Sequence, residues 1–283
     1  MSVAECLNLL GERSAETKIL SGGQSLVPLM NLRLARPEVV VDINGLAELA
    51  FERRDGPVLE VGALARHVEI AESAMVRTAC PLVADAASRI GYPAIRNRGT
   101  LGGSVAHADP AAELPCACLA LGAEIVVRGP EGERRVPADD FFVSHFTTTL
   151  SPSEMVVAVR FPATRQDQGS AFEEFARKTG DFAVVAVGVV VTVTGESIER
   201  AAISVAGVGG RPIRTTAAEA SLVGEAPSSE LFATIASAVT TEVAGTAGED
   251  AEGLRSHISG VLAARALAKA CKRAVGGEAP NGK

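Results

Sequence analysis

Two short segments of the sequence combine paired glycines with hydroxyl side chains. The first is Ser21-Gly22-Gly23-Gln24-Ser25 and the second is Thr100-Leu101-Gly102-Gly103-Ser104. Glycine lets a backbone approach a ligand closely and adopt a positive φ, so successive N–H groups can converge on one anion. The serine and threonine hydroxyls add further donors. Because neither segment contains lysine, we expect a diphosphate held by amides and hydroxyls rather than by an ammonium group.

Neither segment matches the common nucleotide-binding motifs. A phosphate-binding loop would end in Gly-Lys-Ser/Thr, and a Rossmann fingerprint would space three glycines ahead of a helix. A third stretch, Gly207-Val208-Gly209-Gly210-Arg211-Pro212, has proline where the third glycine should stand, so we predict a turn there. A lone Gly-Gly pair is more often structural than ligand-binding, so the surrounding sequence is needed to infer that these two segments bind a ligand.

The cysteines and histidines show no metal-ligand spacing. Cys116 and Cys118 form a close pair, but a four-thiolate cluster needs a second pair, and the remaining cysteines are Cys6, Cys80 and Cys271. We predict small buried residues with free thiols, which suits a reducing compartment. The four histidines, at positions 67, 107, 145 and 257, are scattered along the chain. No metal and no catalytic side chain is predicted.

The composition excludes several classes of protein. The chain has 27 basic and 34 acidic residues and a net charge of −7, which argues against a nucleic-acid surface. No run approaches the roughly 20 apolar residues that span a bilayer. The first residues lack a basic leader followed by an apolar stretch, so we expect a cytoplasmic protein. With 47% hydrophobic but only 4% aromatic residues, the core should consist of Ala, Val, Leu and Ile.

Strands and helices alternate around the two glycine segments. A strand over 18–20 runs into the first segment, and Pro28 suits the first turn of a helix over 28–34, where its missing N–H costs nothing. Hydrophobic periodicity predicts further elements up to residue 163. These are a helix at 3–12, a strand at 39–43, paired strands at 51–54 with 58–61 and at 123–127 with 134–136, helices at 68–76, 82–90 and before 121, and a strand at 155–161.

The character of the sequence changes after residue 170. The polar stretch 164–170 has no periodicity and is interpreted as a domain boundary. Beyond it, the pattern predicts three strands followed by three helices, which is typical of an antiparallel sheet covered on one face. The strands are expected at 172–177, 183–194 and 198–205, and the helices at 217–222, 231–243 and 253–274. The tail at 276–283 is expected to be loose.

Three stretches resemble the FAD subunits of molybdenum hydroxylases, which include the medium chains of carbon monoxide dehydrogenase and of bacterial xanthine and nicotinate dehydrogenases. They are the first segment with Pro28 and Arg33 after it, the run from Ile95 to Pro110, and Lys178-Thr179-Gly180-Asp181-Phe182. The likeness covers nearly the whole chain in the same order. Gln24 and Ser104 depart from the His and Asn frequent in the family, but both keep a hydrogen-bonding side chain. Family members usually carry one more strand ahead of the first helix.

The resemblance implies an α+β fold of three parts. Two small α/β lobes, 1–57 and 58–163, would form a PCMH-type FAD-binding domain, and 170–276 would form a C-terminal domain with a three-stranded antiparallel sheet and helices. It implies one non-covalent FAD and two partners: a small iron–sulfur subunit with two [2Fe–2S] clusters and a large subunit with molybdenum cofactor. The complex would be a dimer of heterotrimers.

The resemblance also assigns roles to single residues. Residues 21–25 and 100–104 would contact the diphosphate, so that a Cβ on Gly23 or Gly102 would push it away. Lys18, Ile19 and Leu20 would line the groove through their backbone. Asp109 would hold an FAD hydroxyl or, alternatively, cap the helix after Pro110. Phe172 would shield the isoalloxazine or, alternatively, pack in the core.

The function implied is transfer of electrons from the partner's clusters through FAD to an external acceptor. One alternative is a single-chain FAD-dependent reductase or oxidase of the same superfamily, which would need a substrate domain with its own acid. Another alternative is a non-catalytic assembly scaffold, against which the intact glycine segments argue.

Overall fold

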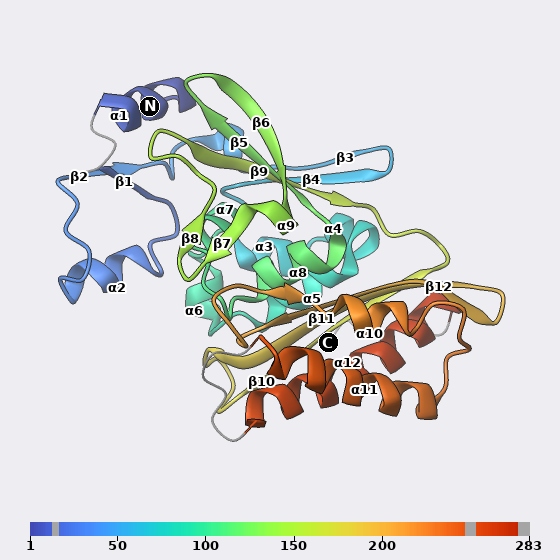
Figure 1. The fold of residues 1–283 in the computed structure, drawn as a ribbon. Coiled ribbons are helices and arrows are strands. Elements are labelled where there is room, and N and C mark those ends of the chain that lie inside the picture. The colour runs from blue at the N-terminus through green and yellow to red at the C-terminus, as the bar shows by residue number, and fades with distance from the viewer. Residues whose placement is uncertain (13–16, 247–252, 277–283) are drawn as a thin grey trace.

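A small parallel sheet carries the first glycine segment. The computed structural model describes residues 1–12, 17–246 and 253–276. Strand β1 (Thr17–Leu20) pairs in parallel with β2 (Val39–Asp42), and helix α2 (Leu26–Asn31) lies in the connection between them. Because parallel strands end at the same edge, the residues after Leu20 and after Asp42 lie side by side. This lobe stands to one side of the body of the molecule (Figure 1).

A five-stranded antiparallel sheet forms the next layer, in the order β3-β4-β9-β5-β6. Its strands are β3 (Glu52–Asp55), β4 (Val58–Gly62), β5 (Glu124–Gly129), β6 (Gly132–Pro137) and β9 (Met155–Pro162). The central strand β9 is a nearly continuous apolar run because both of its faces are covered. Helix α1 (Val3–Glu12) packs on one face through Val3, Cys6 and Leu10.

The expected division between the lobes, at residues 57 and 58, falls between the paired strands β3 and β4. The two strands form one hairpin of the five-stranded sheet, whereas β1 and β2 form a sheet of their own. We therefore propose that the division between the lobes lies between β2 and β3.

Helices fill the space between the five-stranded sheet and a second sheet (Figure 1). They are α3 (His67–Glu72), α4 (Ala74–Ala79), α5 (Pro81–Arg89), α6 (Pro93–Arg96), α7 (Leu101–His107), α8 (Glu113–Leu121) and α9 (Ala138–Phe141). A short turn of 3-10 helix, η1 (Ala47–Leu49), and the small hairpin of β7 (Phe142–Ser144) and β8 (Thr147–Thr148) lie beside them. The cysteines of α8 are buried here and free, as predicted, and so are the other three.

The single helix expected at 68–76 is wrong, because Ser73 divides it into α3 and α4. Ser73 has an extended backbone, and its Oγ accepts a hydrogen bond from the amide of Val76 at 3.2 Å. A serine in this position competes with helical bonding and caps a new helix instead.

The C-terminal part is an antiparallel sheet with helices on its outer face, as expected. Its strands are β10 (Gln168–Ala176), β11 (Ala183–Thr194), β12 (Ser197–Ala206) and β13 (Ile213–Arg214), in that order. Helices α10 (Thr216–Ala220), α11 (Ser229–Ala244) and α12 (Leu254–Ala274) cover the face away from the central helices. The expected count of three strands is therefore one short, since β13 pairs with the end of β12.

The glycine-rich stretch at 207–212 is a turn, as predicted. It connects β12 to β13. Gly207 adopts a φ of +85°, and a Cβ there would meet the carbonyl oxygen of Val184 at 2.4 Å, so both the conformation and the space require glycine. The expected loose tail falls largely at 277–283, outside the described residues. None of the helices in the described ranges is long and apolar enough to cross a membrane.

Candidate functional site

The two glycine segments meet in the structure, although their contacting residues are 79 positions apart. The hydroxyl oxygens of Ser21 and Thr100 are 2.9 Å apart. Gly22 is buried, and a Cβ on it would lie 2.4 Å from the carbonyl oxygen of Arg98 and 2.8 Å from Cα of Gly99. Glycine at position 22 is therefore required for the two backbones to touch.

The first segment carries a run of backbone amides that is available to a ligand. The amides of residues 22–26 donate no hydrogen bond to the described part of the chain. Gly23 adopts a φ of +72°, and its carbonyl accepts from Val27 where α2 begins. The hydroxyl of Ser25 makes no bond within the described residues either, whereas Gln24 Nε2 donates to the Gly22 carbonyl at 2.9 Å. Five successive free N–H groups before a helix fit an anionic oxygen acceptor.

The second segment differs from the expected loop, because it is the start of helix α7. Thr100 is the N-cap, and its hydroxyl accepts from the Gly103 amide at 3.2 Å. The amides of Leu101 and Gly102 donate to the carbonyls of Ala65 and Ala63 at 3.0 and 2.9 Å. The Ser104 amide donates to the Thr100 carbonyl. The expectation that amides of both segments converge on one anion is thus wrong for residues 101–104, whose amides already have partners.

Gly102 and Gly103 serve different purposes. A Cβ on Gly102 would lie 2.5 Å from Cβ of Ala63, so this glycine allows α7 to pack against the chain after β4. The expected reason for Gly102, space for the diphosphate, is therefore wrong. A Cβ on Gly103 would lie 2.7 Å from Thr100 Oγ1 and 2.9 Å from Ser21 Oγ. Gly103 is the glycine that keeps the meeting point of the two segments open.

The second segment offers hydroxyl groups in place of amides. The bond between Ser21 and Thr100 uses one of their two hydroxyl protons, so the other proton stays available whichever oxygen donates. The hydroxyl of Ser104 is half-buried and makes no hydrogen bond within the described residues. The meeting point therefore presents the free amides of the first segment, one free proton of the Ser21–Thr100 pair and the free hydroxyl of Ser104.

His67 contacts the backbone of the second segment, and no pattern in the sequence indicated this supporting role. Its Nε2 lies 2.9 Å from the Thr100 carbonyl oxygen, so this nitrogen carries the proton, since a carbonyl can only accept. A Cβ on Gly99 would lie 2.6 Å from Cε1 of the ring, which shows how closely the backbone packs on it. Burial lowers the pKa of His67 to about 4, so the ring is neutral near pH 7.

Asp109 lies after α7 and does not cap a helix. Its Oδ1 accepts from the Ala111 amide at 2.9 Å, while α8 begins at Glu113 with Ala112 in the N-cap position. The alternative role as an N-cap is therefore wrong, because the two residues after Pro110 stay outside the helix. The Asp109 carboxylate is half-buried.

Glu113 is a second acid that sequence reasoning missed. It is 8% exposed, and apart from its own backbone amide no group in the described residues bonds to its carboxyl. Burial, together with the nearby acids Glu174 and Asp109, raises the pKa of Glu113 to about 7. Glu174, which lies near it, has a buried oxygen without a partner in the described residues. A buried carboxyl oxygen without a partner is costly, so this oxygen could accept a hydrogen bond from a ligand hydroxyl.

The two phenylalanines near the C-terminal sheet are placed very differently. Phe172 is 4% exposed within the central core, in accord with its alternative role in packing. Phe182 is 80% exposed, in the turn after β10. Gly180, with a φ of +81°, places this turn against the ring of Tyr92, which precedes α6. Of these two phenylalanines, Phe182 is therefore the one whose ring is available to a ligand.

The strand before the first segment supports it through its backbone. Lys18, Ile19 and Leu20 belong to β1, and the Leu20 carbonyl accepts from the Ile43 amide. A Cβ on Gly23 would lie 3.2 Å from Cδ1 of Leu20, so the strand end and the glycine are in close contact.

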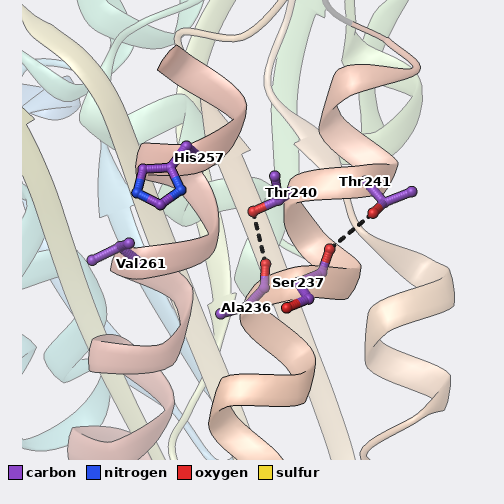
Figure 2. Close-up of a pocket in the computed structure, with 6 residues that line it drawn as sticks. All are labelled: Ala236, Ser237, Thr240, Thr241, His257 and Val261. Atoms are coloured by element: carbon purple, nitrogen blue, oxygen red, sulfur yellow. Dashed lines mark hydrogen bonds between the residues drawn. The ribbon is translucent and has the colours of Figure 1, made fainter. Parts of the chain in front are cut away.

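A shallow hollow of about 320 Å³ lies elsewhere, between α11 and α12 (Figure 2). Its hydroxyls are already used, because Thr240 and Thr241 donate to the carbonyls of Ala236 and Ser237 in their own helix. His257 and Val261 line it from α12. It contains none of the residues of the two glycine segments.

Comparison with known protein families matches both parts of the chain. Residues 1–164 match the FAD binding domain in molybdopterin dehydrogenase. Residues 170–270 match the CO dehydrogenase flavoprotein C-terminal domain. The first match ends at residue 164 and the second begins at residue 170, which are the two ends of the polar stretch; the last three residues of that stretch belong to β10.

Similar proteins are known in sequence and in structure. The chain is 40% identical over 280 residues to the 6-hydroxypseudooxynicotine dehydrogenase complex subunit alpha of Paenarthrobacter nicotinovorans, covering 96% of this chain and 93% of that protein. The fold matches a chain of carbon monoxide dehydrogenase from Hydrogenophaga pseudoflava with a TM-score of 0.91 and 36% identity, over 96% and 95% of the two chains. It also matches quinoline 2-oxidoreductase from Pseudomonas putida 86, with a TM-score of 0.90, 32% identity and coverage of 96% and 95%.

Proposed function

Because the chain belongs to the family of FAD-binding medium subunits of molybdenum hydroxylases, we propose that it is the electron-transfer subunit of such a complex. Its cofactor is FAD, and molybdenum and iron–sulfur centres belong to other subunits. When bound, FAD would supply the redox chemistry, accepting electrons from [2Fe–2S] clusters of a partner and passing them to an external acceptor.

The observation that carries this proposal is the run of free amides at residues 22–26, opposite the hydroxyl pair of Ser21 and Thr100. These groups would hold the diphosphate together with the hydroxyls of Ser25 and Ser104. Hydrogen bonds to a charged acceptor contribute ~1.5–3 kcal/mol each, so this set suffices for a tightly held group without a lysine. Residues 18–20 would line the groove through their backbone, and Leu101 and Gly102 would support α7.

The remaining contacts follow from the free groups beside the meeting point. Asp109 and Glu113 would accept hydrogen bonds from FAD hydroxyls, because both carboxyls have capacity that the described residues do not use. Phe182, rather than Phe172, would lie against the isoalloxazine, since only its ring is exposed. These residues bind and orient the cofactor and exclude water; we assign no catalytic acid or base to the chain.

We propose a small iron–sulfur subunit and a large molybdenum subunit as partners, assembled as a dimer of heterotrimers. The relatives described above include a subunit of a dehydrogenase complex, which supports a multi-subunit assembly. Five buried free thiols suit a reducing compartment, so we place the complex in the cytoplasm. Substrate chemistry would belong to the molybdenum subunit.

The test is to purify the full chain with its partners and alone. The complex should contain one FAD per chain, released to the supernatant by acid, and substrate should bleach the flavin absorbance anaerobically. The chain alone should not oxidise heterocycles, aldehydes or carbon monoxide with a dye acceptor. Turnover without partners would favour the single-chain flavoenzyme, and a complex without flavin would favour the scaffold.

A further inference from the structure

Two side chains outside both glycine segments connect one lobe to the other. Asn44 follows β2, and its Nδ2 donates to the Ser21 carbonyl at 2.8 Å. Arg66 precedes α3, and one terminal nitrogen of its guanidinium donates to Asn44 Oδ1 at 2.7 Å. The other terminal nitrogen donates to the carbonyl of Arg98, directly before the second segment. We infer that Asn44 and Arg66 are positioning residues for FAD, an inference that rests on the cofactor assignment above.

The Asn44 amide can adopt only one orientation. Asp42 Oδ1 lies 2.9 Å from the Asn44 backbone nitrogen and 2.5 Å from its Nδ2. The two hydrogens of Nδ2 thus go to Asp42 and to Ser21, and Oδ1 accepts from Arg66. A flipped amide would place its oxygen against two acceptors and its NH₂ group against a guanidinium. Asn44 therefore holds the Ser21 carbonyl in a defined direction.

Arg66 is anchored on the side of the second segment. Its backbone forms an isolated antiparallel bridge with Thr100, and the flanking groups pair as well: Leu101 donates to Ala65, and His67 donates to Gly99. Both terminal nitrogens of Arg66 are engaged with protein oxygens. Two of its five N–H donors thus connect Asn44 with the backbone of residue 98, and through these bonds Arg66 positions both segments.

The first segment needs this support because little else holds it. Helix α2 has no buried residue, so the connection after the segment contributes no core packing. The remaining links to the second segment are the Ser21–Thr100 hydroxyl bond and the contact of Gly22 with Arg98. Loss of the Asn44–Arg66 connection would let the free amides of residues 22–26 turn away from the hydroxyl pair.

The experiment compares Arg66→Gln, Arg66→Lys, Asn44→Ala and the double variant Arg66→Gln/Asn44→Ala. All are full chains, prepared in the same complex in which the wild-type chain retains FAD. Both Arg66 variants and Asn44→Ala should raise the dissociation constant of FAD about tenfold, measured by flavin fluorescence on dilution. The double variant should bind FAD with the same dissociation constant as the single variant that binds it less tightly, because the two residues act as one unit. At saturating FAD, the visible circular dichroism of the bound flavin should also change.

Arg53→Gln is the matched control, since Arg53 pairs with Glu60 on the exposed β3–β4 hairpin and should leave FAD affinity unchanged. The thermal midpoint of the FAD-free chain should be the same in all variants. Wild-type affinity in Arg66→Lys would show that only the charge matters and would overturn the inference. The inference would also be overturned if the losses of FAD affinity in the single variants added up in the double variant, or if they appeared only in variants with a lowered thermal midpoint. A wild-type assembly without FAD would instead refute the cofactor assignment.

Discussion

At the scale of single residues, Gly102 and Gly103 are adjacent but have opposite surroundings. In Gly103→Ala the new methyl group would press on the hydroxyls of Thr100 and Ser21, so FAD affinity should fall at least tenfold with little loss of apoprotein stability. In Gly102→Ala the methyl group would meet Ala63, and the fold itself should lose ~1–3 kcal/mol from overpacking. FAD titration and denaturant unfolding of both variants separate the two effects. Equal behaviour of the variants would contradict the assignment.

The pKa of Glu113 gives a second prediction, about stability in the absence of FAD. A carboxyl whose pKa rises from 4.5 to about 7 on folding favours the folded state when protonated. Its contribution is therefore fully present below pH 4.5 and is lost as the pH rises through about 7. Glu113→Gln should match the wild type near pH 4.5 and exceed it at pH 8 by ~3 kcal/mol, since each unit of pKa is worth ~1.4 kcal/mol.

Denaturant unfolding of the FAD-free chain at both pH values measures this difference. Glu131→Gln is the control, because that acid is exposed in the turn between β5 and β6 and forms no ion pair with the described residues. A constant difference between Glu113→Gln and the wild type at all pH values would rule out the titration of Glu113 as the cause.

At the scale of elements, Ser73 decides that α3 and α4 are separate helices. Ser73→Ala removes the hydroxyl that caps the Val76 amide and also donates to Glu52, and should cost ~0.5–2 kcal/mol, measured by denaturant unfolding. FAD affinity should not change, because the Ser73 hydroxyl bonds to Val76 and Glu52, which belong to neither segment. Ser88→Ala is the matched control, since that exposed hydroxyl donates to the Asp85 carbonyl within the last turn of α5. A loss no larger than that of Ser88→Ala would exclude the cap.

At the scale of the whole molecule, FAD should join two lobes that differ in their free backbone groups. Amides of residues 22–26 have no partner in the described chain, so they should exchange hydrogen rapidly without FAD and slowly with it. The amides of Leu101 and Gly102 already donate to Ala65 and Ala63, so they should be protected in both states. Hydrogen exchange with mass spectrometry checks this contrast. Protection that appears with FAD only around α7 would reverse the roles of the two lobes.

Binding to both lobes should also stabilise the whole chain. At a free FAD concentration of 100 times the dissociation constant, the free energy of unfolding should rise by ~2.7 kcal/mol if FAD does not bind the unfolded chain. Thermal unfolding over a series of FAD concentrations measures this rise. A midpoint independent of FAD concentration would show that FAD does not bind the folded chain specifically.

The sequence by itself determined the features that depend on residues close together along the chain. The glycines and hydroxyls of both segments, the apolar run of β11 and the proline that ends the turn at 207–212 act through local backbone conformation and hydrophobic periodicity. The polar stretch before β10 likewise marked the change of sheet, and the cysteines of α8 were expected to be buried.

Only the tertiary structure decided which of these groups remain free for FAD. The amides of Leu101 and Gly102 are unavailable because the chain after β4 presents the carbonyls of Ala65 and Ala63 to them. Glu113 became a candidate through burial next to Glu174, and Arg66 through its reach to Asn44. Such pairings join residues far apart in the chain, so no local pattern encodes them. A glycine motif shows which groups a ligand could use, and long-range packing determines which of them it finds unpaired.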